Sequence, residues 1–496
     1  MTIVSIVAIA IGMVQLHNGR ADLRITQTTV GDTPVTIFRP ASDVPAPVIV
    51  IAHGFAGSQQ LMQPFAQTLA HAGYIIVTFD FIGHGRNPVP IRGAIGDGET
   101  ITAQLLRQLG EIVDYGKTLG GDGRLALLGH SMASDIVIRA AATRPDIQAT
   151  IAVSAFSKAV TATSPRNLLV IVGAWEPHVL KDEGLRMVRL SAGEAAAAGT
   201  TYGDFALGTA RELTIAGGVE HIGVLYSRDS LTRSAQWLGS AFNRPVSGAI
   251  DRRGVWLALM LAGFLALAWP LSHLLPGANA QPVGAGLRWK ALLAAALLPA
   301  VATPLLLWKL PTDFLPMLLG DYLMLHFLIY GILTAAVTRA MHAQPMSAPA
   351  SWRAATVAAV AVALYSLVTI GGILDRDVFS FMPILQRVPL ILAVALGTVP
   401  YFLADEWLTR GPQTRRGAYA LTKGCFLLSL ALAIALNPMK LFFLAIIVPA
   451  LLLLQIVFGL ISRWSYRSTR HPLPGALANA LVFAWAIGVT FPLIAR

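Results

Sequence analysis

The sequence predicts a protein in two parts: an α/β domain with a mostly parallel sheet and helices on both faces, followed by an all-α bundle that spans a membrane several times. Of the 496 residues, 55% are hydrophobic and only 13% are charged, whereas ordinary soluble domains carry about 25% charged residues. After Arg253 the apolar residues form long stretches, many near the roughly 20 residues that cross a bilayer. Before Arg253, short apolar runs alternate with charged residues, Gly and Pro, as in a soluble α/β domain.

The net charge of +11 does not indicate a nucleic-acid-binding protein. Much of the positive charge lies in short connections between apolar segments, for example Arg463, Arg467 and Arg470, where membrane topology explains it. The aromatic and basic groove pattern that suits single-stranded nucleic acid is not found. The one cysteine, Cys425, lies in an apolar stretch and excludes an intrachain disulfide. The lipid bilayer is therefore the expected partner of the second half, and the oligomeric state stays open.

Eight spans are predicted in a membrane domain over residues 254–496. They are 254–273, 289–308, 314–337, 354–373, 382–403, 418–436, 441–461 and 474–494. A further apolar run opens the chain. It lacks a basic leading region and an A-x-A cleavage site, so an uncleaved anchor over residues 1–18 is favoured, with a signal peptide as the alternative.

Basic residues mark every second connection between the predicted spans. They are Arg288 and Lys290, then Arg339 and Arg353, then Arg410, Arg415 and Arg416, then Arg463, Arg467 and Arg470. The intervening connections, around Asp313, 375–377 and 437–440, carry little net positive charge. By the positive-inside rule the basic connections are cytoplasmic. The α/β domain is then expected outside the cytoplasm of a bacterial-type inner membrane, although one span more or fewer would reverse this.

Ionisable side chains inside predicted spans often mark function, because they are costly in hydrocarbon. Asp321 and His326 lie in the third span and are candidate functional residues within the membrane, with a structural role as the alternative. They are five residues apart and do not share a helix face well, so no pair between them is required. Arg387 and Lys423 lie near span ends, where a structural pair or snorkelling to the interface explains them.

Residues 21–245 are predicted to form the α/β domain. The run Val48–Ala52 suits a strand that is buried on both faces. The following elements are a helix over 62–72, a strand over 74–79, a helix over 103–119, a strand over 124–128 and a helix over 135–142. Strands that alternate with helices in this way indicate a mostly parallel sheet.

The segment Gly129-His130-Ser131-Met132-Ala133 carries the most information about chemistry. A serine between small residues, placed between a strand and a helix, is typical of a nucleophile elbow, in which the tight turn excludes bulky neighbours. The turn exposes the serine hydroxyl, and the helix N-terminus offers N–H donors to a developing oxyanion. Ala133 stands where the G-x-S-x-G pattern has its second glycine, and the turn has to accept this extra methyl group.

Residues from about 28 to 243 resemble the α/β-hydrolase family, especially its lidless members of dienelactone-hydrolase or peptidase-like type. The matching segments are the elbow, His53-Gly54, Asp80-x-x-Gly83-x-Gly85, Gly173-Ala174-Trp175-Glu176 and Glu220-His221-Ile222-Gly223. Nucleophile, acid and histidine follow one another in the family's order. The resemblance covers a little under half of the chain and assigns no role to the membrane bundle.

The resemblance implies a catalytic triad. Ser131 would be the nucleophile that forms an acyl-enzyme, and His221 the base that takes its proton. Glu176 would orient His221 and stabilise its imidazolium, as Asp does in most members. If the strand before Glu176 ends elsewhere, Asp182 or Asp204 could take its place.

The backbone N–H groups of Phe55 and Met132 would form the oxyanion hole, because they follow the His-Gly pair and the nucleophile. The nearby Asp80, His53 and His84 are expected to stabilise turns rather than to bind a metal. No metal ligand cluster and no phosphate-binding loop is recognised in the sequence, so neither a metal nor an organic cofactor is expected.

The stretch 154–166, where many family members insert a helical cap, is short here. An open pocket, or one covered by the membrane bundle and lipid, favours an amphipathic or lipid-like ester as the substrate. The function expected is therefore a membrane-bound serine hydrolase of carboxylesterase or lipase type. The alternative is a transporter or sensor whose α/β domain processes or only binds the ligand. Asp321 and His326 are the only support for transport, and Ala133 in the elbow is the feature that favours a sensor without catalysis.

Overall fold

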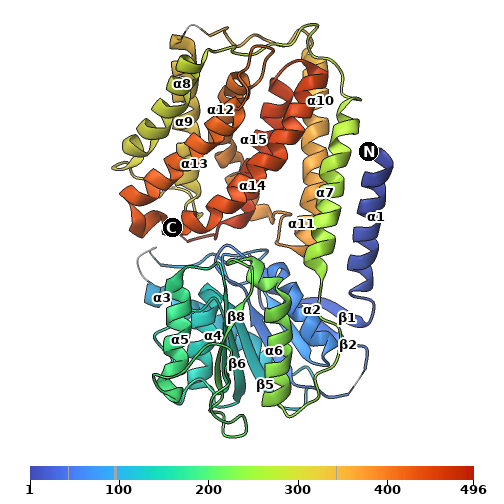
Figure 1. Cartoon of the computed structure of the whole chain (residues 1–496), viewed down its shortest axis with the longest axis vertical. Coiled ribbons are helices and arrows are strands. Elements are labelled where there is room, and N and C mark those ends of the chain that lie inside the picture. The colour runs from blue at the N-terminus through green and yellow to red at the C-terminus, as the bar shows by residue number, and fades with distance from the viewer. Residues whose placement is uncertain (43, 94–97, 342, 496) are drawn as a thin grey trace. The chain divides into compact units, whose positions relative to one another are not determined.

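The computed structural model of the chain describes residues 1–42, 44–93, 98–341 and 343–495. The chain divides into two compact units. We call Ile11–Leu259, Leu374–Ser380 and Pro492–Arg496 the sheet unit, and Met1–Ala10, Met260–Ile373 and Phe381–Phe491 the helical unit. Each unit is described by itself (Figure 1).

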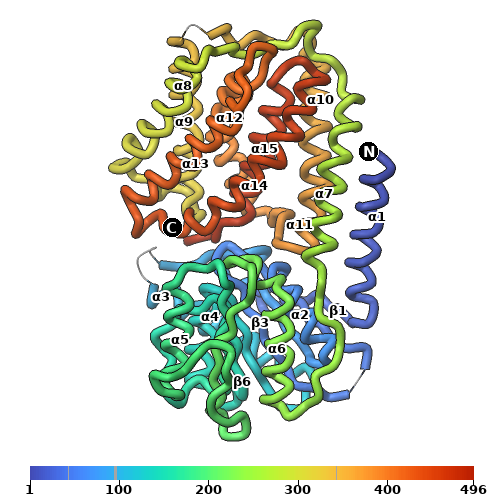
Figure 2. Tube along the Cα trace, in the orientation of Figure 1, coloured from blue at the N-terminus to red at the C-terminus, as the bar shows by residue number. Residues whose placement is uncertain are grey.

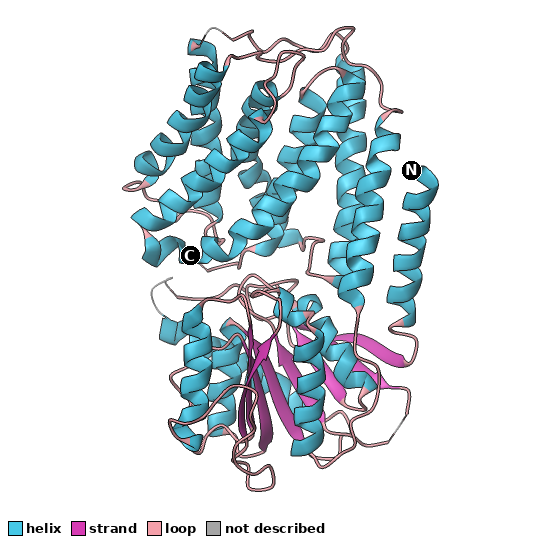
Figure 3. Ribbon diagram, viewed as in Figure 1, coloured by secondary structure: helices cyan, strands magenta, loops and turns pink. Residues whose placement is uncertain are grey.

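The sheet unit is built on a twisted, mostly parallel sheet (Figure 3). Its strands are β1 (Leu23–Val30), β2 (Thr33–Pro40), β3 (Val48–Ala52), β4 (Ile75–Phe79), β5 (Leu125–His130), β6 (Ile147–Val153), β7 (Leu168–Gly173) and β8 (Arg211–Ala216). Within the described residues the eight strands have the order β1-β2-β4-β3-β5-β6-β7-β8. The strands β1 and β2 pair antiparallel, β2 pairs antiparallel with β4, and every other pairing is parallel.

Helices cover both faces of the sheet. They are α2 (Gln63–His71), α3 (Gly98–Lys117), α4 (Met132–Thr143), α5 (His178–Ala192) and α6 (Arg228–Ala241). Successive side chains of a strand point to opposite faces. In β3, Ile49 and Ile51 accordingly pack in the core under α2 and α6, whereas Val48 and Val50 pack under α3 and α4. Because β3 is buried on both sides, its sequence is a continuous apolar run.

The helical unit contains the long apolar helices. In the described part of the chain, eight helical segments are long and apolar enough to cross a membrane by length and composition. They are α7 (Arg253–Ser272), α8 (Trp289–Leu307), α9 (Gly320–Ala340), the continuous helix Trp352–Asp377, the segment Leu385–Thr409, α13 (Ala418–Leu436), α14 (Pro438–Thr469) and α15 (Leu473–Thr490). Within these, Trp352–Asp377 comprises α10 (Trp352–Tyr365), a π-helical turn and α11 (Gly371–Asp377), and Leu385–Thr409 ends in α12 (Val388–Thr409). Both parts of the predicted fold class are confirmed.

Two predicted spans begin later than expected. The third was expected from residue 314, but α9 begins at Gly320, four residues after Pro316. Asp321 is therefore in the first turn of α9 and not deep in a span. The fifth was expected from residue 382, but α12 begins at Val388, with Pro389 in its first turn, where a missing N–H costs little.

The N-terminal helix α1 (Thr2–Asn18) packs along α7 (Figure 1, Figure 2). Gly263 of α7 makes this close approach possible. A Cβ atom on Gly263 would lie 2.9 Å from Cγ1 of Ile9 and 3.1 Å from the carbonyl oxygen of Ser5. Small residues at helix interfaces in membranes let two backbones come close in this way.

Candidate active site

The candidate site lies where the strand order of the sheet reverses. The chain places β4 on one side of β3 and β5 on the other. In open α/β sheets, the loops at the carboxyl ends of strands around such a switch point form the ligand crevice. Ser131 follows β5 directly, and His53 follows β3 directly.

Ser131 has the backbone of a nucleophile elbow. Its φ of 54° and ψ of −118° lie outside the regions that side chains prefer. Its N–H donates to the carbonyl oxygen of Val153 at 2.8 Å, which ties the turn to β6. A Cβ atom on Gly129 would lie 2.7 Å from the carbonyl carbon of Ala133, so glycine is required there. Ala133 itself is fully buried, and the turn accommodates its methyl group.

The structure brings Ser131, His221 and Glu176 together in one hydrogen-bonded chain. Oγ of Ser131 lies 3.0 Å from Nε2 of His221, and Nδ1 of His221 lies 2.5 Å from Oε1 of Glu176. The Glu176 side chain is completely buried, and a quarter of the His221 side chain is exposed. The buried carboxylate holds the imidazole so that Nε2 faces the hydroxyl, which is the arrangement required of a base and its orienting acid.

A second serine, which sequence analysis did not identify, orients the carboxylate. Oε2 of Glu176 accepts hydrogen bonds from Oγ of Ser154 at 2.9 Å and from the N–H of Gly173 at 2.7 Å. Ser154 directly follows β6 and has a positive φ of 55°. A polar residue at the end of a buried strand beside the nucleophile strand is the signal that could have indicated it.

Glu220, the residue before His221, stabilises the loop that carries His221. The carboxylate of Glu220 accepts from the N–H groups of Ile222 and Gly223, both at 2.7 Å. The other candidate acids lie elsewhere: Asp182 is on α5, and Asp204 closes an exposed turn by accepting from Ala206 and Leu207. Among the carboxylates considered from the sequence, Glu176 is the one that the structure places beside His221.

The loop after β3 packs against the nucleophile. A Cβ atom on Gly54 would lie 3.0 Å from Cβ of Ser131 and 3.1 Å from Nδ1 of His130. The backbones that carry the two expected oxyanion donors, Phe55 and Met132, are therefore adjacent, since each follows one of these contacting residues.

Asp80 and His53 hold turns, as expected from the sequence. Asp80 accepts from the N–H of Gln59 at 2.8 Å through one oxygen and from the N–H of Arg86 at 2.9 Å through the other. Nε2 of His53 accepts from the N–H of Phe81 at 3.1 Å. The described ranges contain no group of three or more His, Cys, Asp or Glu side chains arranged to hold a metal ion.

Two buried histidines beside the site are expected to make stability depend on pH. Burial lowers the pKa of His53, and burial together with the neighbouring His221 lowers the pKa of His130 well below 6.5. In the folded chain both imidazoles therefore take up a proton at lower pH than in the unfolded chain, where uptake occurs near pH 6.5. The unfolded state binds more protons below this pH, so the free energy of unfolding should fall as the pH falls through about 6.5.

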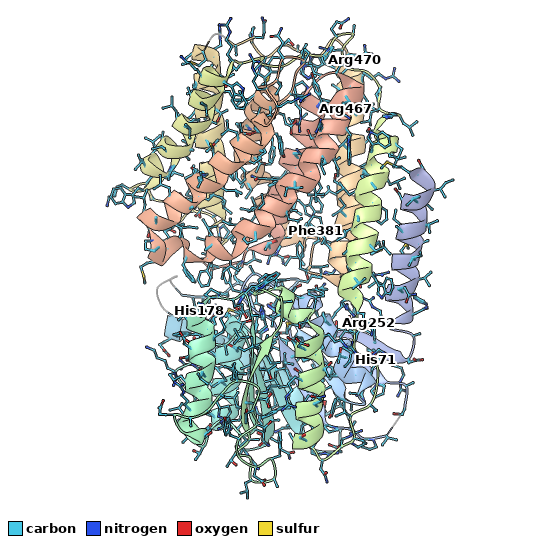
Figure 4. All side chains as sticks on the ribbon, viewed as in Figure 1. His71, His178, Arg252, Phe381, Arg467 and Arg470 are labelled. Carbon is cyan, nitrogen blue, oxygen red and sulfur yellow. The ribbon has the colours of Figure 1, made fainter. Side chains whose placement is uncertain are left out.

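Thermal unfolding of the full chain at about pH 7.5 and about pH 5.5 measures this loss. His130→Gln should reduce the loss, because one of the two groups no longer titrates. His178→Gln is the matched control, since His178 is exposed on the same unit (Figure 4). Equal pH dependence in His130→Gln and wild type would contradict the assignment.

The structure does not bring the two intramembrane candidates together. Asp321 accepts from the N–H groups of Phe314 and Leu315, at 2.6 and 3.2 Å, and so fixes the connection before α9. His326 is fully buried, with Nε2 3.2 Å from Oγ of Ser429 on α13. Asp321 therefore stabilises a loop through hydrogen bonds, and this structural role argues against the hypothesis that it takes part in transport.

The strand order of the sheet, its reversal at β3 and the nucleophile elbow define the class of the N-terminal half. It is an α/β-hydrolase domain. The family model described as serine aminopeptidase, S33, matches residues 43–192. The C-terminal half consists of long apolar helices of membrane-spanning length.

Solved structures of hydrolases are similar to this half of the chain. A putative dienelactone hydrolase from Klebsiella pneumoniae has 17% identity and a TM-score of 0.34, covering 45% of this chain and 99% of that one. A predicted CIB-like hydrolase from Thermoplasma acidophilum has 16% identity and a TM-score of 0.34, covering 44% and 97%. A putative lipase from Acinetobacter baumannii has 15% identity and a TM-score of 0.33, covering 47% and 97%. The comparison with curated proteins gives no match.

Proposed function

We propose that the protein is a membrane-bound serine hydrolase that cleaves an ester-like bond of an amphipathic or lipid-like substrate. The observation that carries the proposal is the continuous chain from Oγ of Ser131 to Nε2 of His221, at 3.0 Å, and from Nδ1 of His221 to Glu176, at 2.5 Å. A buried acid, an imidazole and a hydroxyl in this order convert a weak nucleophile into a reactive one.

In the proposed reaction, Ser131 attacks the substrate carbonyl carbon while Nε2 of His221 takes the hydroxyl proton. The negative oxygen of the tetrahedral intermediate accepts hydrogen bonds from the N–H groups of Phe55 and Met132. The bond to the leaving oxygen then breaks, and that oxygen takes the proton from His221. Water attacks the acyl-enzyme in the same way, releases the carboxylic acid and restores Ser131. Glu176 stabilises the imidazolium that forms in each half-reaction.

Apolar side chains around the site support a lipid-like substrate. Phe156 lies in the loop after β6 and is 52% exposed, and Trp175 lies in the loop after β7 and is 72% exposed. Ile222 directly follows the catalytic candidate His221 and is 38% exposed. All three come from loops at the carboxyl edge of the sheet, where Ser131 lies. Exposed apolar side chains at this edge of the sheet suit an acyl chain or a membrane interface. The loop between β6 and β7 contains no helix that could form a cap.

The fold of the sheet unit also supports eight crossings. Leu374–Ser380 contains the end of the fourth candidate span, Pro492–Arg496 follows the eighth, and both segments belong to the sheet unit. An even number of crossings returns the chain to the side on which α7 begins. Arg467 and Arg470 lie at the end of the helical unit opposite Phe381 (Figure 4). With the positive-inside rule, these observations favour an extracytoplasmic hydrolase domain, with α1 as an uncleaved anchor beside α7.

Labelling of the detergent-purified full chain with a fluorophosphonate probe tests the proposal. We expect the wild type to be labelled, and Ser131→Ala and His221→Ala to lose labelling by at least about 10³-fold in rate, because each removes a triad member. The same preparations are then given esters of increasing acyl length. Turnover that depends on Ser131 and rises with acyl length is the expected result.

Ser134→Ala serves as a matched control, since its hydroxyl donates to the carbonyl oxygen of Ser131 and does not contact His221. A folded wild type that stays unlabelled would refute the proposed hydrolase. Labelling with a preference for short, soluble esters would leave the hydrolase and refute the lipid-like substrate.

A further inference from the structure

The end of the fourth candidate span and the first residues of its connection to the fifth fold as part of the sheet unit. We call this stretch, Leu374–Ser380, the connector. Its backbone forms a hydrogen-bonded turn, because the N–H groups of Val378 and Phe379 both donate to the carbonyl oxygen of Leu374, at 2.9 and 2.8 Å. A compact turn of this kind presents its side chains and its last N–H group in defined directions.

The connector binds the loop that carries Phe55. We call residues 53–60 the His-Gly loop. The N–H of Ser380 donates to Oγ of Ser58 at 2.9 Å, and Oγ of Ser380 donates to Oε1 of Gln60 at 3.0 Å. Nε2 of Gln60 in turn donates to the carbonyl oxygen of Asp375 at 3.3 Å. Ser58 is 1% exposed and Ser380 is 3% exposed, so these polar groups satisfy one another away from water.

An ion pair joins the connector to the loop that follows β4, residues 80–91. A guanidinium nitrogen of Arg86 lies 2.6 Å from Oδ2 of Asp375. The backbone N–H of Arg86 donates to Asp80, whose other oxygen accepts from the N–H of Gln59 in the His-Gly loop. The connector therefore contacts the His-Gly loop directly, through Ser380, and indirectly, through Asp375, Arg86 and Asp80.

The C-terminal segment, Pro492–Arg496, also contacts the loop that follows β4. The N–H of Leu493 donates to the carbonyl oxygen of Gly83 at 2.8 Å, and the N–H of Ile91 donates to the carbonyl oxygen of Leu493 at 2.9 Å. A Cβ atom on Gly83 would lie 2.6 Å from that oxygen of Leu493, so the approach requires glycine. Two segments at the ends of candidate spans thus contact loops beside the nucleophile: the connector contacts the His-Gly loop, and the C-terminal segment contacts Gly83 and Ile91.

We propose that the connector is a positioning element of the hydrolase, which holds the His-Gly loop so that the N–H of Phe55 meets the oxyanion. On its other side the loop rests on Ser131 through Gly54, and Ala56 within it has a positive φ of 55°. Strained backbone persists where surrounding contacts hold it. Displacing a catalytic group by about 1 Å can cost about 10²-fold in rate. The inference rests on the proposed function, and it makes residues from the C-terminal half of the sequence contribute to the rate of catalysis.

The test measures ester hydrolysis by full-length variants in detergent. Asp375→Asn and Arg86→Gln each remove the charge pair with little change in shape. We expect each to lower kcat by about 10-fold, a fraction of what losing one oxyanion donor costs, and to leave KM within about twofold. Because both changes break one contact, the double variant should be no slower than the slower single variant. Ser380→Ala, which deletes only the hydroxyl that binds Gln60, is a milder second probe.

The matched control is Asp313→Asn. Asp313 also lies in a connection between candidate spans, but it pairs with Lys440 of the helical unit at 2.6 Å. Its kcat should equal that of the wild type. Variants of Asp375 and Arg86 that lose thermal stability but keep kcat, or effects on kcat that multiply in the double variant, would overturn the inference and leave the proposed function standing. Absence of turnover that depends on Ser131 in the wild type would refute the proposed function itself.

Discussion

Glu176→Gln is expected to lower kcat for ester hydrolysis by about 10⁴-fold while the protein stays folded. The amide has nearly the shape of the carboxylate, so Ser154 and Gly173 keep a partner of similar size. Its NH₂ group, however, can donate to Nδ1 of His221, which favours the tautomer with the proton on Nε2. Nε2 is then unable to accept the proton of Ser131, and the imidazolium loses the negative charge that stabilises it. Rates of probe labelling and of ester turnover both report this change.

Asp182→Asn is the matched control, because Asp182 was the neighbouring candidate from the sequence and lies on α5. It should keep full activity. A Glu176→Gln variant with more than about a tenth of wild-type kcat would contradict the role given to Glu176, since an acid that orients the base contributes far more than tenfold. Ser154→Ala should have an intermediate effect, because it removes one of the two hydrogen bonds that hold the carboxylate.

Asp405→Leu is expected to destabilise the helical unit strongly. Asp405 of α12 and Lys423 of α13 form an ion pair whose two side chains are each only 5% exposed. The Lys423 ammonium also lies 4.6 Å from the ring centre of Tyr419 and 5.3 Å from that of Tyr401. Removing one partner leaves an uncompensated buried charge, which costs about 3–5 kcal/mol in comparable buried pairs.

The thermal unfolding midpoint of the full chain in detergent measures this loss. The double variant Asp405→Leu with Lys423→Leu should recover most of it, because no charge is then left unpaired and apolar side chains fill similar space. Asp313→Asn, which breaks the partly exposed pair with Lys440, should shift the midpoint little, since such pairs contribute about 0–1 kcal/mol. A double variant as unstable as Asp405→Leu alone would show that the loss comes from packing and not from the charge.

The pair also decides between the two roles expected for Lys423, which were snorkelling to the interface and a structural pair. The structure gives Lys423 a buried partner, Asp405. Arg387 is likewise buried, and its guanidinium donates to the carbonyl oxygens of Gly488 and Phe491 at 3.0 and 2.8 Å. Both side chains connect helices, so their polar character serves the packing of the bundle.

Local patterns in the sequence were sufficient for the fold class and for the elements that carry the triad. The run Val48–Ala52 is apolar throughout because β3 is buried on both faces, and that pattern is visible without the structure. The elbow around Ser131 is equally local, since the small residues on either side are needed within one turn. Hydropathy alone predicts earlier starts for the third and fifth spans than α9 and α12 have, because it does not distinguish an apolar connection from an apolar helix.

The sequence by itself determined the two-part fold class, the nucleophile elbow, and the candidate triad of Ser131, His221 and Glu176. Only the tertiary structure decided that Ser154 holds Glu176 and that Ser380 and Leu493 hold the loops beside the nucleophile. The physical reason is the range of the interactions. Periodicity, turns and strand ends depend on neighbours within a few residues. The contact between Ser58 and Ser380 depends on where the chain returns after several long apolar helices, and no local pattern contains that information.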